Sequence, residues 1–118
     1  MTPQVQNIEA WSDAAFHETV EVTLDKAPQD FSAWTAFELL LFDSYKAPAS
    51  AATGTVTVDA TTPGRLILDI AQAALAGCFT AGETKTTKEM PYVLRAKPGT
   101  SYRIRLMYGT MTLHRGLP

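Results

Sequence analysis

Apolar and polar positions alternate most clearly between Met90 and Leu113, and this alternation predicts β-structure. Every second residue from Tyr102 to Leu106 is apolar, and the residues between them are polar. Because side chains along a strand alternate between two faces, one set is expected in a core and the other in solvent. The same period runs through Tyr92 and Leu94, and a Pro-Gly turn separates the two strands. Gly109 interrupts the pattern near the end, where we expect a bulge or a bend.

Four upstream segments predict further strands. The range 16–24 alternates well enough to be the first solid strand, and 34–42 is rich in aromatic and aliphatic residues, as expected of a central strand. The ranges 55–59 and 65–70 flank a Thr-Thr-Pro-Gly turn and should pair as a hairpin. Together these strands indicate an antiparallel β-sandwich of about seven strands.

The remaining segments predict one helical turn, two loops and an arm. The range 69–76 favours a single short helix that ends at Gly77, where a helix C-terminus often needs a positive φ. The ranges 44–54 and 81–89 hold turn-forming and polar residues and are expected to be exposed loops. Residues 1–15 are weakly patterned and are interpreted as an N-terminal arm, which leaves 16–118 as a single β-sandwich domain.

Composition and charge exclude several classes of protein. The 118 residues carry a net charge of −2, which gives no electrostatic reason to expect binding to nucleic acid. The longest apolar run is too short to span a membrane, and the N-terminus lacks the features of a signal peptide, so we expect neither membrane attachment nor export. The single cysteine, Cys78, fits a reducing compartment or a particle assembled inside a cell, and we expect it to be a small buried side chain.

No constellation of residues predicts catalysis, a metal or a cofactor. His17 and Glu18 begin a sequence similar to a metalloprotease helix, but the second histidine is absent and the alternation favours a strand. There is no Gly-x-Ser-x-Gly motif and no glycine-rich phosphate loop. The sequence therefore predicts a protein that is not an enzyme and has no cofactor.

Four residues are candidates for an interface. Arg95, Arg103 and Arg105 could form a basic stripe on one sheet face that docks an acidic partner, or they could be a solvated face that keeps a sheet edge soluble. Trp34 is expected to pack between the sheets. Trp11 lies in the weakly patterned arm and is the better candidate for an intermolecular anchor, since aromatic residues dominate interface hot spots.

The order of elements resembles a known family over roughly residues 16–115. It is similar to the small immunoglobulin-like domain at the N-terminus of phage baseplate upper proteins and related prophage tail-fibre proteins. The segments that carry the resemblance are Asp30-Phe31-Ser32-Ala33-Trp34, Ala73-Ala74-Leu75-Ala76-Gly77, Pro91-Tyr92-Val93-Leu94 and Gly109-Thr110-Met111-Thr112-Leu113. The resemblance implies an all-β, immunoglobulin-like antiparallel β-sandwich.

The resemblance also implies a function. We expect a non-enzymatic structural or assembly protein of a phage or prophage tail, located in the virion and assembled in the host bacterial cytoplasm. Its partners would be other virion proteins or copies of itself, without nucleic acid or membrane. Because the sequence ends a few residues after the closing strand, we expect a self-contained module without a fibre stem. The alternative is a small ligand-binding module of the carbohydrate type, whose site would be formed by the loops 44–54 and 81–89 with Tyr45 nearby.

Overall fold

The computed structural model describes residues 3–24, 27–47, 49–80, 82–99 and 102–116. Within these ranges the chain forms ten strands, one short α-helix and one turn of 3₁₀ helix. In chain order they are β1 (Gln4–Val5), β2 (Ile8–Trp11), β3 (Phe16–Glu21), β4 (Thr23–Leu24), β5 (Ala27–Pro28), the 3₁₀ turn (Phe31–Ala33), β6 (Thr35–Leu41), β7 (Ala52–Val58), β8 (Arg65–Ile70), α1 (Gln72–Ala76), β9 (Thr87–Lys97) and β10 (Ile104–His114).

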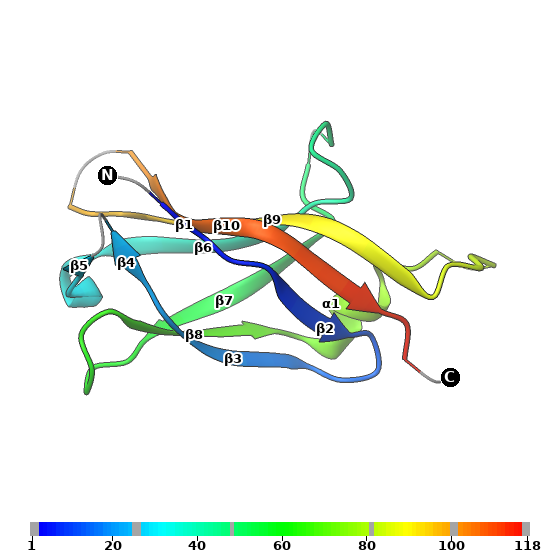
Figure 1. Ribbon diagram of the computed structural model, residues 1–118, viewed down its shortest axis with the longest axis horizontal. Coiled ribbons are helices and arrows are strands. Elements are labelled where there is room, and N and C mark those ends of the chain that lie inside the picture. The colour runs from blue at the N-terminus through cyan, green and yellow to red at the C-terminus, as the bar shows by residue number, and fades with distance from the viewer. Residues whose placement is uncertain (1–2, 25–26, 48, 81, 100–101, 117–118) are drawn as a thin grey trace.

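Most of the strands belong to one curled mixed sheet. Its order is β1–β10–β9–β6–β7–β8–β3, and β2 also pairs with β10. The sheet curls at β7, because residues 52–54 pair with β6 and residues 55–58 pair with β8. Figure 1 shows β10, β9 and β6 in the upper layer, with β8 and β3 below them. The short strands β4 and β5 form a separate pair.

One hydrophobic core fills the space inside the curl. The alternation in β8 buries Leu66, Leu68 and Ile70, while the residues between them remain partly exposed. From the upper layer, Leu94 and Met111 are completely buried in the same core. Ala10 of the arm also belongs to it. In β8 the period of two therefore reports the core-facing side correctly, but Tyr102, expected on the core face with Ile104 and Leu106, is 64% exposed and lies outside β10.

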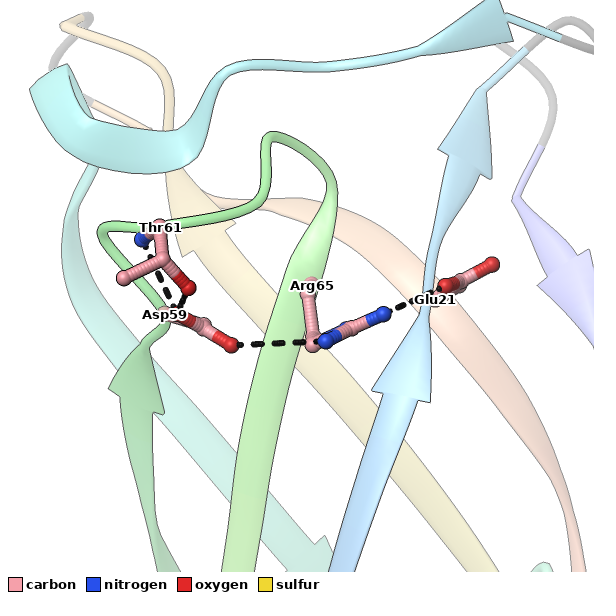
Figure 2. A network of polar contacts seen from close by, with 4 residues as sticks. All are labelled: Glu21, Asp59, Thr61 and Arg65. Carbon is pink, nitrogen blue, oxygen red and sulfur yellow. Dashed lines mark hydrogen bonds and ion pairs between the residues drawn. The ribbon is translucent and has the colours of Figure 1, made fainter.

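A polar network holds the turn between β7 and β8 (Figure 2). The Asp59 carboxylate accepts hydrogen bonds from the backbone N–H of Thr61, at 2.9 Å, and from its hydroxyl, at 2.6 Å. These bonds lower the pKa of Asp59. Arg65 lies 3.8 Å from the Asp59 carboxylate and donates a 3.0 Å hydrogen bond to Glu21 on β3. The network thus ties the turn to the neighbouring strand.

The principal strand pairings match the sequence prediction. β7 and β8 form the expected antiparallel hairpin, and β9 and β10 form the expected pair on either side of the Pro-Gly turn. β6 is a central strand between β9 and β7. The first solid strand is divided, because β3 ends at Glu21 and the chain resumes strand geometry at Thr23. Trp34 packs against the edge of the core, with its ring perpendicular to that of Phe31.

The prediction of a purely antiparallel arrangement is wrong. Both strands of the arm pair with β10 in parallel, so the sheet is mixed. The number of strands is also higher than the expected seven, because the described residues contain ten. The two arm strands and the short pair β4–β5 are not predicted as separate strands.

Two predictions about glycines are also wrong. β10 continues through Gly109, and the change of register lies between Arg105 and Met107 instead. Gly77 follows α1 with a φ of −67°, so it does not supply a left-handed C-terminus. The helix itself is shorter than expected and starts at Gln72, because 69–70 complete the alternation of β8.

Candidate functional site

The described part of the arm, residues 3–15, forms one long edge of the sheet. Its register against β10 is constant, from Gln4 opposite Met107 to Trp11 opposite His114. Between β1 and β2 the Gln6 N–H donates to the Tyr108 carbonyl at 3.0 Å. The side-chain oxygen of Asn7 then accepts a 3.1 Å hydrogen bond from the Thr110 N–H. A side chain thus replaces a missing backbone bond, and the two short strands behave as one (Figure 1).

Gly109 allows the arm to pack closely against β10. A Cβ at this position would lie 2.3 Å from the carbonyl oxygen of Gln6, so only glycine allows the two backbones to come this close. The Tyr92 hydroxyl, from the residue opposite Gly109 on β9, donates a hydrogen bond to the same carbonyl. Burial raises the pKa of Tyr92 to about 12. Gly109 and Tyr92 were noticed in the sequence only as turn and strand residues, although an unexplained glycine inside a strand pattern can signal a close backbone approach.

The arm leaves one edge of its backbone without a strand partner among the described residues. Gln6 and Ser12 donate their N–H groups to β10. Because backbone groups of successive residues point to opposite sides of a strand, those of Val5, Asn7 and Glu9 point away from β10. Val5 is 64% exposed along this edge. This edge is referred to below as the arm edge.

Trp11, the predicted intermolecular anchor, lies at the end of the arm edge. Its side chain is 49% exposed, and its ring stacks on His114 with 4.9 Å between the ring centroids. One ring face is therefore fixed and the remainder is accessible. The contact gives Trp11 a defined orientation before any partner binds, which lowers the entropic cost of using it as an anchor.

The other free edge of the sheet, β3, is protected differently. His17, Glu18, Thr19 and Glu21 are all exposed there, and His17 pairs with Asp69 on β8. Charged side chains on an edge strand discourage pairing with another chain. Of the two edges, the arm edge is the one less protected by charge.

Glu38 on β6 pairs with two of the three arginines of the predicted basic stripe, and its single charge balances one of them. Arg95 donates to one carboxylate oxygen at 2.7 and 2.8 Å, and Arg103 approaches the other at 2.9 Å. Arg103 also donates to the carbonyl of Ala36 at 3.0 Å. The third arginine, Arg105, lies over the ring of Tyr108, 5.4 Å from its centroid. Arg105 lies opposite Arg95 in the register of β9 and β10, but it does not share the Glu38 carboxylate.

Arg105 lies in a groove on the outer face of the upper layer. The groove has a volume of about 290 Å³ and is referred to below as the Tyr–Arg groove. The loop between β6 and β7 projects above this layer (Figure 1) and contributes Tyr45. Strands β9 and β10 supply most of the remaining lining residues. The complete lining is Phe42, Ser44, Tyr45, Ala47, Pro91, Tyr92, Val93, Arg95, Arg105, Tyr108 and Gly109.

A second hollow, of about 810 Å³, lies where the two predicted loops approach each other. Ala51 comes from the first loop, and Lys85 and Lys88 come from the second, but the lining contains no aromatic residue. Cys78 also lines it, and burial raises the pKa of its thiol, which disfavours the reactive thiolate. The hollow therefore lacks the stacking surface that the carbohydrate alternative needs in these loops.

Across the described ranges, no group of three or more His, Cys, Asp and Glu side chains is arranged to hold a metal ion. The same ranges include no helix that could span a membrane, and α1 has only five residues. No protein-family model matches the chain, and no curated protein is significantly similar to it in sequence.

Proposed function

We propose that this chain is a non-enzymatic assembly module that binds a second copy of itself through the arm edge. The observation that carries the proposal is the arm edge itself, whose outward backbone groups lie between the exposed side chains of Val5 and Trp11. An edge of this kind is a ready template for a strand from another chain. The protein acts through protein–protein contacts, and a phage or prophage tail is the setting that its family resemblance suggests.

We also propose a specific type of β-fold for this chain. We infer an immunoglobulin-like sandwich in which β10, β9 and β6 face β7, β8 and β3. An arm strand parallel to the last strand and a short helix between β8 and β9 support this inference. In such a domain the arm strand lies at the margin of one layer, where a partner can reach it.

A twofold pairing of two arm edges has one favourable register. If the antiparallel pairing is centred on Ile8, Val5 lies opposite Trp11 of the partner subunit and Asn7 lies opposite its Glu9. All of these residues have backbone groups that point outward, so they form hydrogen-bonded pairs. The register joins an aliphatic to an aromatic side chain and places no like charges opposite each other. The same patch serves both copies, as a twofold interface requires.

Light scattering after size-exclusion chromatography tests the proposal with matched edge variants. Glu9→Pro removes an outward N–H from the arm edge without removing a bond to β10, and Glu9→Ala controls for the lost carboxylate. Thr19→Pro makes the equivalent change on β3, where Val22 donates inward and Thr19 points outward by alternation. We expect the full chain and Thr19→Pro to form dimers and Glu9→Pro to be monomeric, with similar circular dichroism spectra.

Two results would overturn this proposal. A full chain that remains monomeric at high micromolar concentration would remove self-association as its function. Dimers that persist in Glu9→Pro and dissociate in Thr19→Pro would assign the interface to β3. The setting is tested separately by the gene neighbourhood, where tail or capsid genes are expected and their absence would count against a phage tail.

A further inference from the structure

Arg105 is the one arginine of the described chain without an oxygen partner. Arg65, Arg95, Arg103 and Arg115 each donate to a carboxylate or to a backbone carbonyl. Arg105 has only the ring of Tyr108 beneath it. Its planar guanidinium therefore presents an open fork of donors, which is the geometry that binds a carboxylate in a bidentate manner.

The charge of the Tyr–Arg groove favours an anion. Its lining contains Arg95 and Arg105 and no acidic side chain. Glu38 binds Arg95 from outside the lining, but its one charge is shared with Arg103, so the groove keeps the full charge of Arg105 and part of that of Arg95. This net positive charge favours an anionic ligand.

The uncharged surfaces of the groove favour a ring with both apolar and hydroxylated parts. Tyr45 is 82% exposed, and Tyr108 also lines the groove. Pro91 and Val93 add apolar surface to the lining. The hydroxyls of Ser44, Tyr45 and Tyr108 make no hydrogen bond within the described residues, so they are available to a ligand. Aromatic and apolar walls with a few polar groups are typical of small-molecule sites.

The size and the backbone of the groove disfavour an extended peptide. A volume of about 290 Å³ is at the small end of ligand pockets and suits one ring. The floor strands β9 and β10 are paired on both sides, so a peptide cannot join them as an additional strand.

We propose that the Tyr–Arg groove binds a hexuronate residue of an acidic glycan. The carboxylate pairs with the guanidinium of Arg105, and the pyranose ring lies between Tyr45 and Tyr108. This inference goes beyond self-association and uses none of the exposed side chains of the arm edge. The sequence predicted a carbohydrate site between the loops 44–54 and 81–89. The Tyr–Arg groove is lined by the first of these loops but not by the second.

The test is an NMR titration of the full chain with D-glucuronic acid, with D-glucose and acetate as matched probes at the same pH and ionic strength. We expect glucuronic acid to shift resonances of Tyr45, Arg105 and Tyr108, with a millimolar Kd. Glucose lacks the carboxylate and acetate lacks the ring, so each should bind at least about tenfold more weakly, a difference of about 1.4 kcal/mol.

Variants assign the binding to individual side chains. Arg105→Gln should weaken glucuronic acid at least about tenfold, and Tyr45→Ala should weaken both glucuronic acid and glucose. Arg115→Gln is the control, because that guanidinium also lies over an aromatic ring, Phe79, but outside the groove. Dimerisation by light scattering should be the same in all three variants, which separates this inference from the proposed assembly function.

Three results would overturn the inference. If glucuronic acid causes no shift in the groove, the site is not a sugar site. If acetate binds as tightly as glucuronic acid, the groove is a carboxylate site without selectivity for a ring. If a glutamate-rich peptide binds more tightly than glucuronic acid and competes with it, the groove is a peptide site.

Discussion

The hydroxyl of Tyr92 on β9 donates a hydrogen bond to the backbone carbonyl of Gln6 in the arm. The two residues are 86 positions apart, and the bond passes across the strand that separates them, at Gly109. Since Tyr92 belongs to the core and Gln6 to the outermost strand, this bond ties the position of the arm to the core. The proposed interface lies on that arm, so its geometry depends on this contact.

Replacing Tyr92 by Phe tests how strongly the bond holds the arm. The variant keeps the ring but leaves the Gln6 carbonyl without its side-chain donor, so we expect a loss of about 1 kcal/mol in the free energy of unfolding. Urea unfolding measures this loss. Tyr108→Phe is the matched control, because its hydroxyl has no partner within the described chain, and it should change stability little. Equal effects of the two variants would contradict a specific role for the Tyr92 hydroxyl.

Gly109→Ala tests the close packing of the arm against β10 at Gly109. The added methyl would lie 2.3 Å from the Gln6 carbonyl oxygen, which is a backbone atom and cannot rotate away. The arm must therefore move, and we expect a loss of about 2 kcal/mol in stability and faster chymotrypsin cleavage after Trp11.

The control for this substitution is Gly77→Ala. The φ of Gly77 is −67°, and its nearest atom would be 3.4 Å from an added Cβ, so alanine fits there. We expect near-wild-type stability and cleavage. If chymotrypsin cleaves Gly109→Ala at the same rate as the wild type, the arm does not pack against Gly109 as described.

The raised pKa of Tyr92 predicts a loss of stability in alkaline solution. The folded protein holds this proton up to a pKa of about 12, whereas a tyrosine in the unfolded chain releases it near 10.0. The stability contributed by the neutral phenol is therefore complete below pH 10 and is lost as the pH rises towards 12. Urea unfolding from pH 8 to 12 should show a steeper decline for the wild type than for Tyr92→Phe. Parallel declines would contradict the assignment.

Ala36→Gly is expected to stabilise the protein. Ala36 has a φ of 56°, a left-handed conformation that costs alanine about 1 kcal/mol or more, and it lies at the irregularity where β6 changes register against β9. Glycine removes that cost but adds entropy to the unfolded chain, so a net gain of up to about 1 kcal/mol is expected from thermal or urea unfolding. Ala96→Gly, opposite the same irregularity on β9 but without a positive φ, should be destabilising. A loss of stability in Ala36→Gly would show that this backbone is not strained.

Glu38→Gln tests the bridge between Arg95 and Arg103. The Glu38 side chain is 26% exposed and accepts from both guanidinium groups, so we expect a loss of about 1 kcal/mol that shrinks at high salt. Glu21→Gln is the control, because Glu21 is 71% exposed and meets one arginine. Its effect should be close to zero. Similar losses in both variants would contradict the special position of Glu38.

The sequence predicted burial and pairing best in strands where apolar and polar residues alternate along the whole length. Leu66, Leu68 and Ile70 are buried as their spacing predicts, and the hairpin of β7 and β8 follows from that pattern and its turn. The helix starts at Gln72, later than the predicted range 69–76, because the alternation carries the strand through Ile70. Local patterns thus predicted local pairing well.

Long-range contacts could not be predicted in the same way. The large apolar residues of the arm, Val5, Ile8 and Trp11, are spaced three apart, and its pairing partner lies about one hundred positions away, so its short strands show no clear period of two. The three arginines are equivalent in the sequence pattern, but Glu38, from a different strand, pairs with two of them and balances the charge of one. Trp11 was selected for its residue type, and its exposed position agrees with that choice.

Amide hydrogen exchange, resolved residue by residue by NMR, tests the proposed assembly most directly. The amides of Gln6 and Ser12 bond to β10 and should exchange slowly at every protein concentration. The outward amides of Val5, Asn7 and Glu9 should exchange slowly when the dimer is populated and become fast on dilution. If these outward amides exchange equally fast at all concentrations while the full chain remains dimeric, the arm edge is not the interface and the central proposal is wrong.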